Sequence, residues 1–215
     1  MSRPPRSPEE TLKIRKKILK VSLDIISNDG YPNFSMRKLA SKLGLTATTI
    51  YQYFLNKDEI YLAVVEQGFQ MLYDKMYESI NPEDPPETIL RNMLYSYIRF
   101  GVEESNLYNI MMVWRVPKYY DFLGTAVEEA AHREMETALR VLELAQSCIL
   151  ACDFMDNKSD EDKEDIVLEI ICSIHGFISL WNSQVIDYIF STGKQTISDK
   201  RIYRFIDSII NSVGK

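Results

Sequence analysis

The sequence predicts an all-α fold with an N-terminal three-helix head and a larger C-terminal helical body. Apolar residues recur at three- and four-residue steps along most of the chain, and strand-like alternation is missing beyond residue 86. A glycine turn joins two short helical segments within residues 35–57, which is the pattern of a helix-turn-helix. The 215 residues, 46% of them hydrophobic, can bury the core of one large or two small domains.

The first helix is predicted to run from Pro8 to about Asn28. Ser7, Pro8 and Glu10 combine a serine cap, an N-terminal proline and a glutamate at the third position, which is typical of a helix start. The apolar stripe consists of Ile14, Ile18, Val21 and Ile25, and another face carries Lys13, Lys16, Lys17 and Lys20. These lysines either contact DNA phosphates or form an ordinary solvated surface. Residues 1–6 are predicted to be a flexible arm, whose Arg3 and Arg6 either enter a minor groove or have no role.

Residues 35–57 contain the two helices of the motif. Ser35 can cap the first helix, and Gly44 supplies the left-handed residue that ends it. Thr46 can cap the second helix, whose Ile50 and Phe54 point inward one turn apart. The remaining surface of the second helix carries Thr48, Thr49, Tyr51, Gln52 and Tyr53. None of these residues is acidic. A helix that lies in the major groove requires such a face, because a carboxylate there would repel the DNA phosphates.

This region resembles the TetR family of bacterial transcriptional regulators. The run MRKLASKLGLTATTIYQYF is followed by NKDEI, and the family's Leu/Ile-Tyr-x-Tyr/His-Phe signature is matched by Ile50, Tyr51, Tyr53 and Phe54. Lys57 opens the fourth helix, as in the family. The resemblance covers about the first quarter to third of the chain. It implies a DNA-binding homodimer, usually a repressor, whose C-terminal helical domain provides ligand binding and dimerisation.

The predicted DNA contacts fall into three groups. The face of the second helix is expected in the groove, where Gln52 can read a base edge. Helix starts favour phosphate contacts, which applies to Ser35, Arg37 and Thr46. Lys57 is expected to bind a phosphate through its ammonium group. Tyr53 takes the family's phosphate-donor position, and the alternative for both Tyr51 and Tyr53 is that they pack inside the head.

The distribution of charge agrees with a DNA-binding head. Residues 1–60 contain eleven Lys or Arg and six Asp or Glu residues, a balance of +5. The whole chain carries −6, so the remainder carries −11. A basic head on an acidic body is the electrostatic pattern expected of a protein that contacts DNA through one end.

The remainder of the chain divides at a proline-rich linker. Asn56 and Glu59 can cap a fourth helix that ends before Asn81, and three prolines follow within residues 81–86. The predicted domains are a DNA-binding domain at 1–56, a connecting helix at 57–80 and an effector-binding and dimerisation domain at 81–215. Further helices are predicted at about 87–103, 105–113, 119–154, 161–192 and 198–213. The acidic run at 156–165 is predicted to be a solvated loop or a helix start.

The last two helices are apolar on more than one face. One stripe consists of Ile166, Ile170, Ile174, Phe177, Trp181, Val185 and Tyr188, and the final helix adds Ile202, Phe205, Ile206, Ile209 and Val213. A monomer buries one such side, so a twofold partner is expected to bury the other. The family resemblance implies the same homodimer through the last two helices.

The body also carries many aromatic and methionine residues, which suit a hydrophobic or amphipathic effector. The predicted effector-binding residues are Tyr95, Phe100, Met111, Trp114, Tyr119, Phe122, Met135, His175, Phe177 and Trp181. The pocket itself is implied mainly by the resemblance, and plain core packing is the alternative for each residue. Cys148 and Cys152 lie one helical turn apart, as a redox or metal pair would, and the interpretation preferred over that alternative is a pair of buried structural residues.

These observations predict a regulator and exclude most other classes. The chain has only His132 and His175 as histidines and shows no phosphate loop, nucleophile elbow or metal-ligand spacing, so no enzyme activity, cofactor or metal is expected. An odd set of three cysteines, an N-terminus without an apolar core and the interrupted apolar stretch at 166–181 favour a cytoplasmic protein. The alternative function is an architectural or partner-recruiting DNA-binding protein without a small ligand.

Overall fold

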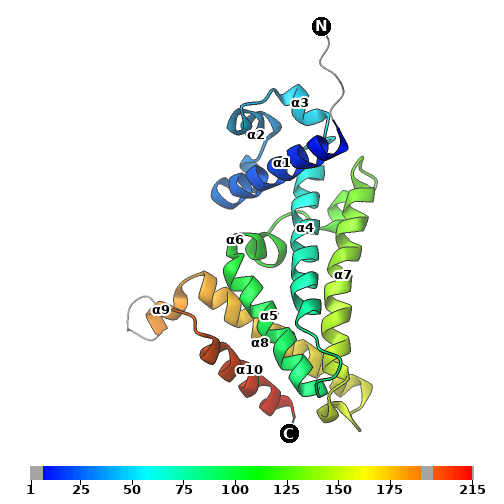
Figure 1. Ribbon diagram of the computed structural model, residues 1–215, viewed down its shortest axis with the longest axis vertical. Coiled ribbons are helices and arrows are strands. Elements are labelled where there is room, and N and C mark those ends of the chain that lie inside the picture. The colour runs from blue at the N-terminus through cyan, green and yellow to red at the C-terminus, as the bar shows by residue number, and fades with distance from the viewer. Residues whose placement is uncertain (1–6, 190–195, 215) are drawn as a thin grey trace. The chain divides into compact units, whose positions relative to one another are not determined.

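The computed structural model describes residues 7–189 and 196–214, and within these ranges all regular elements are helices or helical turns (Figure 1). The α-helices are α1 (Pro8–Asp29), α2 (Met36–Leu43), α3 (Ala47–Tyr51), α4 (Lys57–Glu78), α5 (Pro86–Glu103), α6 (Ser105–Tyr108), α7 (Glu128–Leu150), α8 (Asp160–Asn182), α9 (Val185–Ile189) and α10 (Asp199–Val213). Short helical turns are η1 (Tyr31–Asn33), η2 (Asn109–Val113), η3 (Tyr119–Phe122) and η4 (Asp153–Met155). The all-α prediction is confirmed. The predicted arm at 1–6, with Arg3 and Arg6, lies outside the described residues.

The chain divides into two compact units, Met1–Phe69 with Asn109–Thr137 and Gln70–Tyr108 with Ala138–Lys215. The boundaries between these units fall inside α4 and α7 and after α6. The predicted domains at 1–56, 57–80 and 81–215 instead follow the expected roles: DNA binding, connection, and effector binding with dimerisation. That functional division stays a prediction.

The first unit contains the predicted three-helix head, in which α2 packs against both α1 and α3 (Figure 1). The start of α1 is a capping box: the Ser7 hydroxyl accepts from the Glu10 amide at 3.1 Å, and the Glu10 carboxylate accepts from the Ser7 amide at 2.9 Å. Gly30 ends α1 with a positive φ of 78°. The core of the head consists of Ile18, Ile25, Ile26, Phe34, Leu39, Ile50 and Phe54. Burial of these residues supplies the stability that such short helices lack alone.

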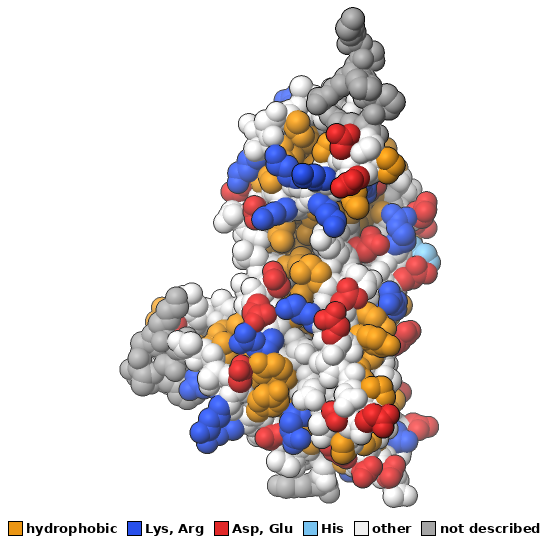
Figure 2. All heavy atoms as spheres, in the orientation of Figure 1, with side chains coloured by type: hydrophobic (Ala, Val, Ile, Leu, Met, Phe, Trp, Pro, Cys, Tyr) orange, Lys and Arg blue, Asp and Glu red, His pale blue; other side chains and the backbone are white. Residues whose placement is uncertain are grey.

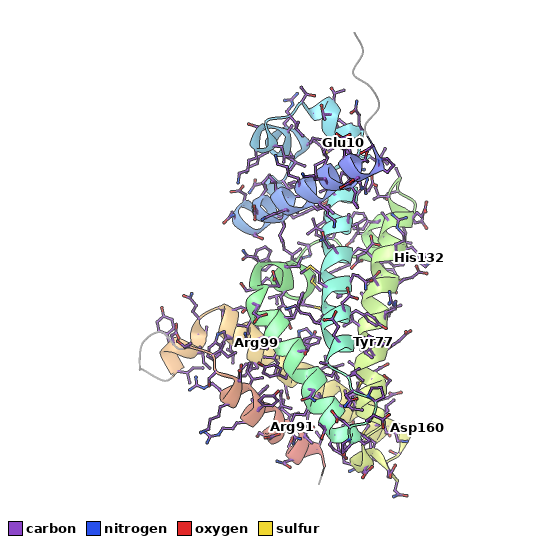
Figure 3. All side chains as sticks on the ribbon, viewed as in Figure 1. Glu10, Tyr77, Arg91, Arg99, His132 and Asp160 are labelled. Atoms are coloured by element: carbon purple, nitrogen blue, oxygen red, sulfur yellow. The ribbon has the colours of Figure 1, made fainter. Side chains whose placement is uncertain are left out.

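In the second unit, α5, α8 and α10 pack on one another. The core of this unit includes buried isoleucines of α8 and α10 together with Leu90, Leu94 and Ile98 of α5. Two arginines of α5, labelled in Figure 3, pair with α10: Arg91 lies 2.6 Å from Asp207, and Arg99 lies 3.7 Å from Asp199. Because both pairs are partly exposed to solvent, they fix the register of the helices more than they add stability.

Two predicted helices are not continuous α-helices. The helix predicted at 119–154 is a helical turn, η3, followed by α7 from Glu128 to Leu150. Gly124 adopts a left-handed φ of 72° between them, which stops the helix. The helix predicted at 105–113 is helical over its whole length, but α6 ends at Tyr108 and a wider π turn follows.

The helix predicted at 161–192 is also wrong in its second half. It breaks after Asn182, because Gln184 takes a left-handed φ of 61° and the Asn182 side chain donates to the carbonyl oxygen of Gly101 at 2.9 Å. Val185 and Tyr188 therefore leave the predicted stripe, and Tyr188 is 83% exposed in α9. Residues 190–192 of this prediction lie outside the described residues.

A close approach of α5 to α8 leads to a stability prediction. A Cβ atom at Gly101 would lie 2.7 Å from Cδ1 and 2.8 Å from Cγ2 of Ile178. We expect Gly101→Ala to lower the free energy of unfolding by about 1–3 kcal/mol, because overpacking outweighs the better helix propensity of alanine. Urea denaturation measures this change. In an Ile178→Ala background, which removes the clashing atoms, the same substitution should cost little, and an equal cost in both backgrounds would contradict this explanation.

Candidate DNA-binding surface

The helix-turn-helix has the local structure that its sequence predicts. The Ser35 hydroxyl accepts from the Lys38 amide at 3.3 Å, and Gly44 ends α2 with a left-handed φ of 66°. The Thr46 hydroxyl accepts from the Thr49 amide at 3.2 Å and so caps α3. Both ends of α2 and the start of α3 are thus fixed by a side chain or a glycine within the motif, which confirms the predicted caps and the predicted turn.

The exposed face of α3 is smaller than predicted. Thr48, Tyr51 and Gln52 are exposed, and no side-chain hydrogen bond of Thr48 or Gln52 involves the described residues. Thr49 is half-buried, with its hydroxyl 2.9 Å from that of Thr46. The expectation that Tyr53 lies on this surface is wrong, because Tyr53 is only 8% exposed. Since α3 ends at Tyr51, helical spacing no longer places residue 53 on the outer face.

The predicted phosphate-binding residues lie at helix starts. Ser35 and Arg37 are exposed at the start of α2, and Lys57 is the first residue of α4. Asn56 caps α4 as predicted, since its side-chain oxygen accepts from the amides of residues 58 and 59 at 3.0 and 2.9 Å. Backbone amides at such starts, together with the cationic side chains, favour a bound phosphate.

Tyr31 holds Lys57 in place, a contact that the sequence did not predict. The Lys57 ammonium nitrogen lies 4.8 Å from the centroid of the Tyr31 ring. The Tyr31 hydroxyl donates to the carboxylate of Asp58, and its ring lies 4.7 Å from that of Tyr61. Burial raises the pKa of Tyr31 far above its ordinary value, so the hydroxyl remains a donor.

The electrostatics of this surface favour an anionic partner. The segment 35–57 contains four basic residues and no acidic one. Lys13, Lys16, Lys17 and Lys20 of α1 are exposed, and Figure 2 shows Lys and Arg side chains gathered over the part of the head where α1 lies. The Lys38–Asp29 pair at 2.8 Å neutralises one cation at this surface. The exposed cations of the described head, such as Arg37, Lys42 and the lysines of α1, can attract phosphate.

Comparison with known proteins identifies the family. A family model described as bacterial regulatory proteins, tetR family, matches residues 18–64. A second model, described as a tetracyclin repressor-like C-terminal domain, matches residues 90–186. The chain belongs to the TetR family. Proteins of this family are non-enzymatic, DNA-binding transcriptional regulators that usually act as dimers.

Relatives and solved structures agree with this assignment. The chain is 28% identical over 91 residues to the fatty acid metabolism regulator protein of Bacillus subtilis, a match over 42% of this chain and 47% of that protein. It is 24% identical over 131 residues to the nucleoid occlusion factor SlmA of Actinobacillus pleuropneumoniae, a match over 55% of this chain and 65% of that protein. The chain thus spans about half to two thirds of the length of these curated relatives.

Two crystal structures show the same fold along most of the chain. A tetR-family regulatory protein from Rhodococcus RHA1 has a TM-score of 0.68 at 16% identity, covering 94% of this chain and 97% of that one. The TetR-family regulator PfmR from Thermus thermophilus also has a TM-score of 0.68 at 16% identity, covering 91% and 94%. Within the described part of this chain, no helix is both long and apolar enough to cross a membrane.

The predicted effector-binding residues of this TetR-family protein fall in both units. In the first unit, Met111 and Phe122 are buried core residues, whereas Trp114, Tyr119 and Met135 are half-buried. The half-buried residues keep partly accessible apolar surface, which an effector contact needs. Their role as effector ligands stays a prediction.

In the second unit, the predicted residues form separate groups. Phe100 is buried, and Phe177 stacks on Phe205 at 4.4 Å and on Trp181 at 5.9 Å between ring centroids. Tyr95 donates to Asp199 at 2.8 Å and borders an open hollow of about 340 Å³, while Trp181 borders another of about 190 Å³. The stacking between these aromatic rings and the hydrogen bond of Tyr95 stabilise the second unit, whether or not an effector also contacts them.

His175 lies between two tyrosines, both of which the sequence analysis missed as its partners. The Tyr108 hydroxyl is 2.5 Å from Nδ1 and the Tyr97 hydroxyl is 3.3 Å from Nε2. Burial lowers the pKa of His175, which keeps the imidazole neutral. A neutral ring has one donor and one acceptor nitrogen, and each can pair with a hydroxyl. The polar histidine is therefore satisfied within the unit.

Glu134 of α7, in the first unit, has a carboxyl group whose pKa burial alters strongly. Burial raises the pKa of its carboxyl to about 7, against the opposing charge of Lys118 and with a smaller contribution from Glu66. The Lys118 ammonium donates to the carbonyl oxygen of Met111 at 3.0 Å. Sequence reasoning missed Glu134 because an isolated glutamate among other charges on α7 gives no sign of its burial.

The raised pKa predicts a pH-dependent stability. Between about pH 4.5 and 7, the folded protein keeps a proton on Glu134 that the unfolded chain has lost, so stability falls as pH rises through this window. We expect the free energy of unfolding of Glu134→Gln to match that of the wild type near pH 4.5 and to exceed it by about 1–2 kcal/mol at pH 8. This difference is smaller than the full pKa shift implies, because water reaches part of the carboxyl group.

Urea denaturation across this pH range measures the difference between variant and wild type. The control is Glu129→Gln, since Glu129 is exposed and pairs only with Arg133 of its own helix among the described residues. A constant difference between Glu134→Gln and wild type at all pH values would contradict the prediction.

The environment of Cys148 and Cys152 favours a structural role over a reactive one. Cys148 and Cys152 are buried and unpaired as a disulfide, and the Cys152 thiol donates to the Cys148 carbonyl oxygen at 3.4 Å. Burial raises the pKa of the Cys152 thiol to about 12, which disfavours the reactive thiolate. Cys172 is exposed on α8. Among the described residues, no group of three or more His, Cys, Asp or Glu side chains is arranged to hold a metal ion.

Proposed function

We propose that this protein is a homodimeric, sequence-specific transcriptional repressor that a small hydrophobic or amphipathic effector releases from a palindromic operator. The observation that carries the proposal is the exposed face of α3. Thr48 and Tyr51 lie on a helix whose start is capped by Thr46, Gln52 follows directly after it, and the surrounding segment 35–57 has no acidic residue. Polar groups that make no other bond can read base edges, and the basic residues around them hold the phosphates.

A second copy of the chain is the proposed partner of α8. Four residues at successive four-residue steps, Leu168, Cys172, Gly176 and Leu180, are all exposed on α8. Apart from the adjoining residues and backbone of α8 itself, no atom of the described chain lies within 4 Å of a Cβ placed on Gly176, so another helix can approach closely there. The exposed positions of α10, such as Arg204 and Ser208, are polar and suit the rim of the interface. A twofold contact through these last two long helices brings two heads to one operator.

Effector release is proposed to act by population shift through α4. Tyr61 of α4 contacts Tyr31 of the head, and its hydroxyl donates to the carbonyl oxygen of Pro117 at 3.2 Å. Pro117 lies between Trp114 and Tyr119, two of the predicted effector-binding residues. An effector that prefers another arrangement of this segment would move α4, change the separation of the two heads and lower operator affinity. The relation of one relative to fatty acid metabolism agrees with an amphipathic effector.

The test combines ligand screening with DNA binding. Fluorescence anisotropy at about 0.15 M salt first compares DNA from upstream of the protein's own gene with a scrambled duplex. Compounds that raise the melting temperature are then added to the DNA complex. A true effector should weaken operator binding by a factor of about 5–150, and DNA should weaken effector binding by the same factor. If every stabilising ligand left operator affinity unchanged, the release mechanism would be wrong.

The architectural alternative has one observation in its favour, the similarity to a nucleoid occlusion factor. In that case the protein would bind its sites without a small ligand and recruit a protein partner. A chain that binds specific DNA but shows no thermal shift with any amphipathic compound would favour this alternative.

A further inference from the structure

Arg15 differs from the lysines that surround it on α1. Lys13, Lys16 and Lys17 are exposed, whereas Arg15 is half-buried. Its Nη1 donates to the carbonyl oxygen of Tyr53, and its guanidinium carbon lies 4.1 Å from the centroid of the Phe54 ring. Arg15 therefore contacts the helix-turn-helix from within the head.

Both contacts are made at the end of the recognition helix α3. Tyr53 and Phe54 follow α3 directly, and their amides bond back to the carbonyl oxygen of Ile50 at 2.9 and 3.2 Å. The end of a helix presents carbonyl groups without helical partners and a partial negative charge. A guanidinium group supplies a donor and a positive charge there, and it stacks on the aromatic ring at the same time.

The short length of α3 makes this contact important for orientation. A helix of five residues has little more than one turn and cannot fix its own direction. Its first turn is fixed by the cap from Thr46, and its end is fixed by buried Phe54 and by Arg15. A tilt of α3 would displace Thr48 and Gln52 from the base edges they are proposed to contact.

We infer that Arg15 is a positioning residue for DNA recognition, which orients α3 from α1 without contacting DNA itself. This inference rests on the DNA-binding function proposed above. It assigns Arg15 a role different from that of the neighbouring lysines, which lie free to bind phosphate. Lysine cannot replace arginine fully here, because an ammonium group cannot donate to the carbonyl and stack on the ring with the same geometry.

The test measures specific and non-specific DNA binding separately. The variants are Arg15→Met, which removes the charge and the donor, and Arg15→Lys, which keeps the charge and protects folding. The control is Arg133→Met, since exposed Arg133 pairs with Glu129 on α7. Anisotropy titrations are made at several salt concentrations between about 0.05 and 0.3 M. They use two duplexes: the one that the wild type selects from a random library, and a scrambled duplex. Circular dichroism establishes that each variant is folded at the assay temperature.

A positioning role predicts a loss of specificity at constant salt dependence. Arg15→Met should bind the selected duplex about 10- to 100-fold more weakly, which corresponds to one weakened base contact, and Arg15→Lys should lose part of that affinity. Binding to the scrambled duplex and the slope of log K against log salt should stay as in wild type and in Arg133→Met.

Two results would overturn the inference. If the salt slope falls by about one unit and both duplexes are bound more weakly, Arg15 is a phosphate contact. If both folded Arg15 variants bind the selected duplex as the wild type does, Arg15 has no part in recognition. A wild-type protein that selects no duplex at all would instead contradict the proposed function, so the two failures are distinguishable.

Discussion

Replacing Leu168 and Leu180 together by glutamate is expected to convert the proposed dimer to monomers and to weaken operator binding by about 10²- to 10⁴-fold. Leu168 is 59% exposed and Leu180 is 42% exposed, and both lie on the stripe of α8 that includes Gly176. In a twofold interface centred on this stripe, the two copies would together place four new carboxylates in the contact. Unpaired charges at a close helix contact are costly, so the interface should not form.

The loss of affinity follows from the loss of the second head. A dimer binds its second half-site at the high effective concentration set by the first, whereas a monomer has one half-site only. Analytical ultracentrifugation measures the oligomeric state, and anisotropy measures operator affinity. Tyr77→Glu is the control, because Tyr77 is an exposed aromatic residue of α4, labelled in Figure 3, outside the α8 stripe. A double variant that remains dimeric and binds DNA normally would show that the interface lies elsewhere.

The double substitution Thr48→Ala with Gln52→Ala is expected to reduce affinity for the operator by about 30- to 1,000-fold. Both side chains are exposed on α3, and neither makes a hydrogen bond within the described chain, so their removal should leave the head folded. Each lost base contact is worth about 1–3 kcal/mol of discrimination. Binding to a scrambled duplex depends on phosphates and should stay nearly unchanged.

The matched control for this surface is Asn28→Ala. Asn28 is an exposed polar residue of the head, and its side chain donates to the Asp24 carbonyl oxygen of its own helix at 2.7 Å. Anisotropy with operator and scrambled duplexes measures all three proteins. If Thr48→Ala with Gln52→Ala weakened both duplexes equally, α3 would hold phosphates only. Unchanged affinity for both would place recognition on another surface.

The local structure of the head was predictable because its signals are local. Ser35, Gly44 and Thr46 act through hydrogen bonds and backbone angles within three or four residues, and all three have the predicted geometry. The burial of Tyr53 was not predictable from spacing, since α3 ends two residues before it. The break after Asn182 depends on a hydrogen bond to Gly101, a residue of another helix, and glutamine is not a residue that usually marks a left-handed turn.

The candidate site was predictable to a similar extent. The residues of the α3 surface could be named because a groove-binding face has a clear composition, free of carboxylates. Which member of the basic run on α1 turns inward depends on the packing of Phe54, so Arg15 gave no signal. The burial of Glu134 and the pairing of His175 with Tyr97 and Tyr108 likewise depend on residues distant in the sequence.

Selection of duplexes from a random DNA library at about 0.15 M salt tests the central claim most directly. The account predicts that the wild type enriches an inverted repeat whose half-site centres lie one or more helical turns apart, about 10 base pairs or a multiple of it. It also predicts that the protein with Thr48→Ala and Gln52→Ala no longer enriches that repeat. Enrichment of no sequence, or of the same repeat by both proteins, would contradict the claim that a dimer reads its operator through α3.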